Sequence, residues 1–261
     1  MKILMIGDIF ARPGRRAVRE NIDAIVREHD VDFVVANAEN AAGGFGLTRD
    51  ICRELFGYGV HVLTGGNHTW DKREIIPILD EDERVLRPHN YPLENPGSGI
   101  YVGTHDGVTI AVLNLQGRVF MPPTDCPFQA ADRLIESVKD EADVILVDLH
   151  AEATSEKYAM AWHLDGRVSA LVGTHTHVQT ADEEVFPKGM AYISDLGMTG
   201  PHRSIIGVKV EQSLGRFLNS RPSRFEAAKG DVRLHAVVID VDEATGGARS
   251  IQRIQRRVPN T

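Results

Sequence analysis

Apolar runs alternate with amphipathic stretches along the N-terminal part of the chain. Residues 2–6, 33–36 and 60–63 are short apolar runs bounded by polar residues or glycine, which predicts β-strands. Between them, residues 15–29 and 48–58 repeat apolar side chains at the helical period, which predicts two amphipathic helices. This β-α-β-α-β order predicts parallel strands with helices packed against them.

The middle of the chain departs from this alternation, because two strand-like runs follow each other directly. Residues 99–104 and 108–115 are joined by His105, Asp106 and Gly107, which predicts an antiparallel hairpin. Further helices are predicted at residues 128–141, 155–163 and 207–218, and further strands at 143–149, 168–172, 179–185, 190–194, 232–241 and 249–257. We therefore predict one α/β domain over residues 1–261, with two mixed sheets face to face and helices outside.

Polar side chains that are able to bind metal stand at the C-terminal ends of five predicted strands. They are Asp8, Glu39 with Asn40, Asn67 with His68, His150, and His175 with His177. The C-terminal edge of the strands is where ligands bind in α/β sheets. The sequence therefore predicts that these side chains meet at one site.

Each of these signals is weak when taken alone. An acid such as Asp8 is more often a helix cap, Gly-Asn-His is a common turn, and a lone histidine such as His150 is more often structural. His175 and His177 are more specific, because alternate residues of an extended chain lie about 6 to 7 Å apart on one face. That spacing reaches two metal ions held about 3.5–4 Å apart. Because a solvated-turn interpretation requires five coincidences at one edge, we favour a metal site.

Composition and charge favour a soluble globular protein over a membrane protein or a non-specific nucleic-acid-binding protein. The chain has 261 residues, of which 42% are hydrophobic and 25% charged, as is ordinary for a soluble globular protein. Its formal charge of −8 and pI near 5.8 disfavour non-specific binding to polynucleotides and anionic membranes. No apolar run approaches the roughly 20 residues that span a bilayer, and Asp8 interrupts the N-terminal run too early for a signal peptide. Cys52 and Cys126 share no motif spacing, so we expect free thiols and a cytoplasmic protein.

The types of donor group in the predicted site indicate which metal ions and which substrates it suits. Two carboxylates, two amides and three histidines, without cysteine, suit divalent ions such as Mn, Fe or Zn. Two such ions against two carboxylates leave a charge of about +2 in the pocket, which suits a phosphate ester. A pair of ions is able to activate a water and to stabilise both the attacking and the leaving oxygen of an in-line displacement.

At these residues the sequence resembles the calcineurin-like metallophosphoesterase superfamily. The pattern of that superfamily is D-x-H, GD-x-x-D, GNH-D/E, a lone His and GH-x-H, and the counterparts here are Asp8, "NAEN", "GNH", His150 and "GTHTH". The resemblance implies a four-layer α-β-β-α sandwich of two mixed sheets flanked by helices. It also implies roles for the matching residues: Asp8 and His177 would hold a first metal, Glu39 would bridge, and Asn67, His150 and His175 would hold a second. His68 would act as the general acid that protonates the leaving oxygen.

The sequence departs from the superfamily pattern at three positions. Phe10 stands where a ligand histidine is expected, the bridging acid Glu39 is not an aspartate, and Thr69 follows His68 where an acid often orients that histidine. Asp71 and Glu74 are the candidates for this orienting acid.

The particular forms "GDIFARPGRRAV", "NAENAAGG", "GGNHTWD" and "DLGMTGPHRSIIG" resemble a narrower bacterial subfamily of 2′,3′-cyclic-nucleotide 2′-phosphodiesterases. That likeness implies a cytosolic, often oligomeric protein with two divalent transition metal ions per chain, iron or manganese before zinc or magnesium. In the subfamily the asparagine after the bridging glutamate is a first-metal ligand, so Asn40 would replace the histidine missing at Phe10.

Three further residues are candidates for substrate binding. Arg12 follows the first strand closely and is able to face a phosphate, although a solvated helix start is the more common explanation for such an arginine. His202 and Arg203 lie in the glycine-rich stretch "GMTGPHRS", which is expected to border the substrate pocket.

The leading hypothesis is a dinuclear-metal phosphodiesterase for small cyclic nucleotides, with 2′,3′-cyclic compounds as substrates and 3′,5′-cyclic ones as further candidates. Attack on phosphorus by a metal-activated hydroxide is expected, with His68 assisting departure of the ribose oxygen. One alternative is a phosphomonoesterase or nuclease of the same superfamily. Another is a non-catalytic regulatory scaffold with a vestigial metal site, which Phe10 supports and the complete replacement ligand set opposes. A homo-oligomer is expected in either case.

Overall fold

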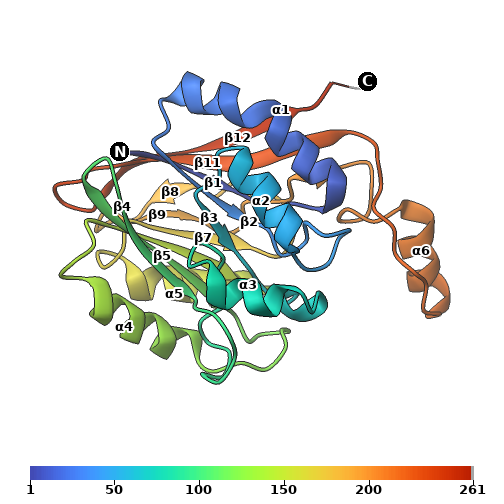
Figure 1. Cartoon of the computed structure of the whole chain (residues 1–261), viewed down its shortest axis with the longest axis horizontal. Helices are drawn as coiled ribbons and strands as arrows, with labels where there is room; N and C mark the ends of the chain where they lie inside the picture. Colours follow the sequence, from blue (N-terminus) through green and yellow to red (C-terminus); the bar gives the residue numbers. More distant parts are fainter. Residues whose placement is uncertain (260–261) are drawn as a thin grey trace.

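The computed structural model describes residues 1–259, and two mixed β-sheets lie face to face at its centre (Figure 1). The first sheet has the strand order β10-β11-β1-β2-β3, with β12 paired to β11. β1 runs parallel to β2 and antiparallel to β11, and β2 runs parallel to β3. Its strands are β1 (Lys2–Ile6), β2 (Phe33–Asn37), β3 (Val62–Thr64), β10 (Gly200–Pro201), β11 (Val232–Val241) and β12 (Ala248–Arg257).

The second sheet has the strand order β4-β5-β6-β7-β9-β8. Its centre is parallel, from β5 through β6 and β7 to β9, and an antiparallel strand closes each side. Its strands are β4 (Ile100–His105), β5 (Val108–Gln116), β6 (Val144–His150), β7 (Ala170–Thr174), β8 (Glu184–Val185) and β9 (Ala191–Ile193). The predicted hairpin is therefore confirmed as β4 and β5.

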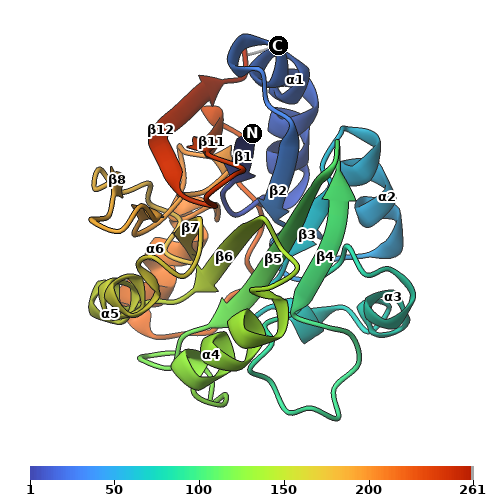
Figure 2. The ribbon, with the colours of Figure 1, turned by 90° about the vertical axis from the view of Figure 1, so that its left-hand side faces the viewer.

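Helices cover the outer face of each sheet, which confirms the four-layer α-β-β-α sandwich (Figures 1 and 2). On the first sheet lie α1 (Ala11–His29) and α2 (Arg49–Gly57), and on the second lie α4 (Pro127–Val138) and α5 (Thr154–Leu164). The short helices η1 (Thr69–Asp71) and α3 (Ile75–Glu81) follow β3, and α6 (Val210–Asn219) projects from the body. Within residues 1–259, no helix combines the length and the apolarity that crossing a membrane requires.

Three buried apolar clusters hold the four layers together. One lies between the first sheet and α1 and α2, one between the two sheets, and one between the second sheet and α4 and α5. On α1, Val18, Ile22 and Ile25 are each at most 2% exposed. Full burial of such a side chain contributes about 1.5–3 kcal/mol, so this periodic stripe anchors the helix to the sheet.

One prediction of local structure was wrong, and one helix was missed. Within the strand predicted at residues 179–185, only Glu184 and Val185 join a ladder, because the side chain of Gln179 donates to Ala236 and the Thr180 amide donates to Asp195. Helix α3 was not predicted, since the proline in its sequence IIPILDE suggests a break. That proline lies in the first turn, where the missing N–H group costs no helical hydrogen bond.

Gly173 is required where β7 passes the segment after β9. A Cβ at Gly173 would lie 1.8 Å from the carbonyl oxygen of Ser194, whereas a Cβ at the exposed Gly57, at the end of α2, would meet no atom within 4 Å. We expect Gly173→Ala to lower the free energy of unfolding by about 3 kcal/mol through overpacking. We expect Gly57→Ala to raise it by about 0.4–1 kcal/mol by restricting the unfolded chain. Urea denaturation measures both, and equal effects of the two variants would contradict the packing described.

Candidate metal centre

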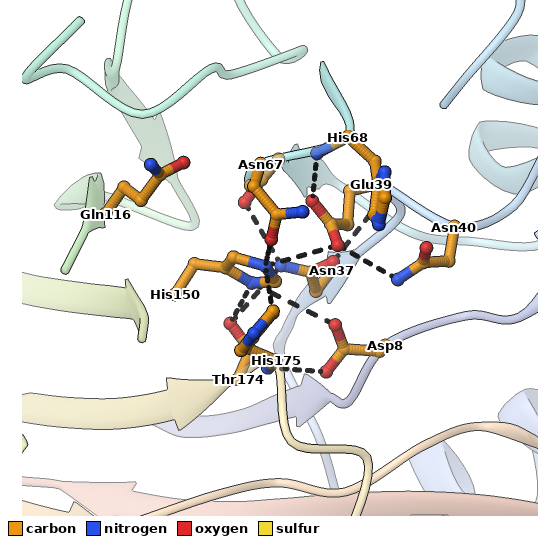
Figure 3. A network of polar contacts seen from close by, with 12 residues as sticks. Asp8, Asn37, Glu39, Asn40, Asn67, His68, Gln116, His150, Thr174 and His175 are labelled. Carbon is orange, nitrogen blue, oxygen red and sulfur yellow. Dashed lines mark hydrogen bonds and ion pairs between the residues drawn. The ribbon is translucent and has the colours of Figure 1, made fainter. Parts of the chain in front are cut away.

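The carboxyl ends of β1, β2, β3, β6 and β7 meet at one edge of the two sheets, and the predicted polar residues converge there (Figure 3). Asp8, Glu39 and Asn40 are each at most 2% exposed, and His150 is fully buried. The side chains come from both sheets, so the site lies at the junction between them.

One group of donor atoms surrounds Nε2 of His150. This nitrogen lies 2.9 Å from Oδ1 of Asn67, 3.2 Å from Oε1 of Glu39 and 3.1 Å from Nδ1 of His175. Ligand atoms of Glu39, His150 and His175 all lie within 4.8 Å of one another. These are the four residues predicted for the second metal, and the structure brings them together.

A second group lies on the other side of the Glu39 carboxylate. Nδ2 of Asn40 is 3.0 Å from Oε1 of Glu39 and 3.3 Å from Nε2 of His177, which in turn is 3.8 Å from Oδ1 of Asp8. The Asn40 amide thus faces two acceptors with its nitrogen, and rotating the amide by 180° presents its oxygen to the same point. These are the residues predicted for the first metal, and Glu39 is shared by both groups.

Three observations show that these residues fit divalent metal ions. Oδ1 of Asp8 is buried without any hydrogen-bond partner, although a buried carboxylate oxygen needs one. A Cβ at Gly66 would lie 2.3 Å from Oε2 of Glu39 and 2.5 Å from Nε2 of His150, so only glycine leaves room for both side chains. Carboxylate, imidazole and amide donors without thiolate suit Mn, Fe and Zn. Their roles as metal ligands remain predictions.

The two buried carboxylates of the site, Asp8 and Glu39, attract positive charge. Burial, only partly offset by the charges of His177 and His150, raises the pKa of Asp8 to about 6. Burial also acts to raise the pKa of Glu39, but the charge and hydrogen bond of His150 outweigh it and lower the pKa to about 2. His150, although fully buried, has its pKa raised to about 9 by the same carboxylate. Burial and the nearby charge of His150 lower the pKa of His175 to about 3. The two acids therefore draw positive charge into the buried site.

A buried network behind the site orients His150. Its Nδ1 lies 2.9 Å from the hydroxyl of Thr174, which donates to Asp148 over 2.7 Å. The other Asp148 oxygen accepts from Thr64 over 2.5 Å and from Asn37 over 3.1 Å. This arrangement leaves Nε2 of His150 facing the site, as a second layer of hydrogen bonds does around metal-binding histidines. Sequence reasoning missed this network, although polar residues inside apolar strands, such as Asp148 in "VILVDLH", are its signal.

The loop that carries His175 and His177 is held by a buried ion pair. Nζ of Lys157 lies 2.8 Å from Asp195, and the same carboxylate oxygen accepts the amide of Thr176 over 3.0 Å. His175 and His177 both have left-handed backbones, with φ of 102° and 65°. Strained backbones of this kind persist where surrounding contacts determine them, and they cluster at functional sites.

His68 lies beside the ligand groups and is oriented by an acid. Its Nδ1 is 2.8 Å from Oδ2 of Asp71, so Nε2 remains available to a substrate. Its backbone amide donates to Oε2 of Glu39 over 2.8 Å. Asp71 therefore orients His68 in place of the acid that the superfamily pattern has at position 69. The Thr69 hydroxyl instead donates to the Gly66 carbonyl within the turn.

Phe10 fills the space beside His177. The two rings meet edge to face with centroids 5.8 Å apart. Gly44 and Gly207, both with positive φ, press against the Phe10 ring, since a Cβ on either would lie within 2.9 Å of it. The ring packs further with Ala11 and Phe225 in a small buried cluster. Phe10 thus provides a tightly packed wall of the site in place of a ligand.

The three predicted substrate contacts lie apart from the donor cluster. Within residues 1–259, no hydrogen bond or ion pair joins Arg12, His202 or Arg203 to the donor residues. Nε2 of His202 lies 3.1 Å from the carbonyl of Met198, and its ring packs on that of His235. Arg203 lines a separate surface cavity with Asp231, and Arg12 lines another beside Phe225. Their roles in substrate binding remain predictions.

The fold agrees with comparisons to known proteins. The sequence profile of the YmdB-like protein family matches residues 4–254. The chain belongs to this family. A relative from Bacillus subtilis (strain 168), the 2′,3′-cyclic-nucleotide 2′-phosphodiesterase, is 48% identical over 254 residues, which cover 97% of this chain and 96% of that protein. The predicted resemblance to metallophosphoesterases of this bacterial subfamily is thereby confirmed.

Two solved structures are similar to this YmdB-like chain over nearly its whole length. A hypothetical protein from Thermus thermophilus is 46% identical with a TM-score of 0.93, covering 99% of this chain and 100% of that one. A novel phosphatase from Mycoplasma pneumoniae is 35% identical with a TM-score of 0.93, covering 98% and 93%. A putative 5′-nucleotidase from Staphylococcus aureus, 15% identical with a TM-score of 0.60, shares the fold and covers 97% of this chain and 54% of that one.

Asn40 provides a direct test of the first ligand group. We expect Asn40→Ala to weaken the metal held by Asp8, Asn40 and His177 by at least about tenfold, because one of its ligands is removed. Metal analysis after dialysis should show content falling toward one ion per chain, together with loss of phosphodiesterase activity. Asn21→Ala is the control, since the Asn21 side chain donates to the carbonyl of Ala17 within α1 and, among residues 1–259, bonds no donor residue of the site. Full metal content and turnover in Asn40→Ala would contradict the assignment.

Proposed function

We propose that this chain is a dinuclear-metal phosphodiesterase that hydrolyses small cyclic nucleotides. The observation that carries the proposal is the position of Glu39, whose Oε1 lies 3.0 Å from Asn40 on one side and 3.2 Å from His150 on the other. A buried carboxylate shared by two donor groups suits two neighbouring ions. The activity for which the Bacillus subtilis relative is named supports 2′,3′-cyclic nucleotides as the first substrates to test, with 3′,5′-cyclic nucleotides second.

This proposal assigns each predicted ligand residue to one or both metal ions. Asp8, Glu39, Asn40 and His177 would hold one ion, and Glu39, Asn67, His150 and His175 would hold the other. Iron or manganese suits these donors best, with zinc or magnesium as alternatives. When bound, the two ions supply Lewis-acid stabilisation of the phosphoryl oxygens and an activated water.

The chain's own residues then control the leaving group. Hydrolysis forms a bond from a water oxygen to phosphorus and breaks the bond from phosphorus to the ribose 2′-oxygen, which needs a proton. We assign that proton to Nε2 of His68, because Asp71 holds Nδ1 at 2.8 Å and so fixes the ring. The His68 amide also donates to Glu39, which ties the position of the acid to that of the bridging carboxylate.

Two alternatives compete with this proposal. A phosphomonoesterase uses the same donors, whereas a nuclease is less compatible with a formal charge of −8. A non-catalytic scaffold is opposed by the bare Oδ1 of Asp8 and by the ordered pair of His68 and Asp71, which a vestigial site has no need to keep.

We also propose a homo-oligomer. Phe217 and Leu218 on α6 are each 77% exposed, and subunit contact is a means of covering them.

His68 and Asp71 separate catalysis from metal binding. We expect His68→Ala to lower kcat on 2′,3′-cyclic AMP by about 10²–10⁴-fold while two metal ions per chain are retained, because the general acid is lost and no ligand is. Asp71→Asn should lower kcat less, through misorientation of the ring. His29→Ala, at the end of α1, is the control and should behave as wild type. Unchanged turnover in His68→Ala would rule out its role as the acid.

A substrate panel tests the proposed activity against its alternatives. The manganese-loaded protein would be assayed with 2′,3′-cyclic AMP, 3′,5′-cyclic AMP, an aryl phosphomonoester and a short RNA. We expect the highest kcat/KM for 2′,3′-cyclic AMP. A preference for the monoester would establish the phosphomonoesterase alternative, and a fully loaded protein without any turnover would establish the scaffold.

A further inference from the structure

A cavity of about 570 Å³ lies beside the N-terminus of α1 and opposite the segment that returns from α6. Four cationic side chains line it: Arg12, Arg16, Arg224 and Lys229. Its single acid, Glu226, already lies 2.6 Å from Lys209, outside the cavity. The cavity therefore carries a net positive charge within a chain whose formal charge is −8.

Three of the four cations of this cavity are not used to hold the fold together. Arg12, Arg224 and Lys229 have no ion pair or side-chain hydrogen bond with any part of residues 1–259. Nε of Arg16 is buried without a hydrogen-bond partner, and Glu20 is 3.8 Å away. The neighbouring Arg15 differs, because it bonds Glu54 at 2.9 Å and the Ala41 carbonyl at 2.6 Å. Like charges gathered without partners repel one another, so an anion would stabilise this arrangement.

Apolar groups form the rest of the lining. The ring of Phe225 and the side chains of Pro13 and Val232 face the same cavity as the cations. A Cβ on Gly43 would meet no atom within 4 Å, so this wall is open. The volume lies within the range of small-molecule sites, about 300–1,000 Å³. A ligand with a phosphate and an aromatic body matches both halves of the lining, whereas inorganic phosphate would leave the apolar half unfilled.

The cavity is separated from the metal centre by Phe10. The Phe10 ring contacts His177 on the metal side, and it packs with Ala11 and Phe225, which line the cavity. The Ala11 amide donates to the carbonyl of Asn40 over 2.9 Å, so the two sites share a wall without sharing ligands. We propose that this cavity is a second binding site, specific for a nucleoside monophosphate. The site does not depend on the phosphodiesterase activity proposed above.

Equilibrium dialysis of AMP against the metal-loaded full chain tests this site. We expect a class of saturable AMP binding that is weakened at least tenfold in the double variant Arg224→Ser/Lys229→Ser and by increasing salt. Both side chains are exposed, so the variant should keep the wild-type unfolding temperature. Arg221→Ser is the matched control, because Arg221 is an exposed arginine of the same segment that does not line the cavity. Adenosine should bind more weakly than AMP, because it lacks the phosphate.

Turnover of an aryl phosphodiester separates the cavity from the metal centre. The double variant should retain this turnover within twofold while losing the AMP site. Absence of AMP binding to the wild type, unchanged AMP affinity in the double variant, or adenosine binding as tightly as AMP would each overturn the proposal. A parallel loss of AMP binding and turnover would overturn it as well, since the cavity would then belong to the catalytic pocket.

Discussion

The buried carboxylate of Glu39 is the constraint on which the rest of the site depends. A carboxylate removed from water loses several kcal/mol of solvation unless positive charge and hydrogen bonds replace it. Here it receives the amide of His68 and the side chains of Asn40 and His150, and Gly66 keeps the space around it open. The pKa of Glu39, lowered to about 2, reflects that compensation. Each surrounding element has to be placed so that these partners arrive together.

The two sheets bring these partners together because the carboxyl ends of their parallel strands meet at one edge. β1, β2 and β3 deliver Asp8, Glu39 and Asn67 from one sheet, and β6 and β7 deliver His150 and His175 from the other. Asp148 connects the sheets below the site, because it accepts hydrogen bonds from Thr64 of one sheet and Thr174 of the other. Preorganisation of this kind keeps donor atoms in place before any ligand arrives. The rigid packing of the two sheets is thus itself part of the chemistry.

Much of this could be predicted from the sequence, because strand ends can be located from apolar periodicity and parallel strands share an edge. Asp8, Glu39 and His150 stand out as polar residues at such ends, so their convergence followed from topology. The contact of Phe10 with His177 and the ion pair of Lys157 with Asp195 could not be predicted from apolar periodicity and topology. They join residues far apart in the sequence through side-chain packing, which leaves no periodic signal.

Anomalous X-ray diffraction from crystals of the manganese-loaded protein distinguishes a dinuclear centre from any other use of the donor residues. We expect two anomalous peaks per chain that share Glu39 as a common ligand. One peak should contact Asp8, Asn40 and His177, and the other Asn67, His150 and His175. A single peak, or two peaks without Glu39 between them, would contradict this expectation.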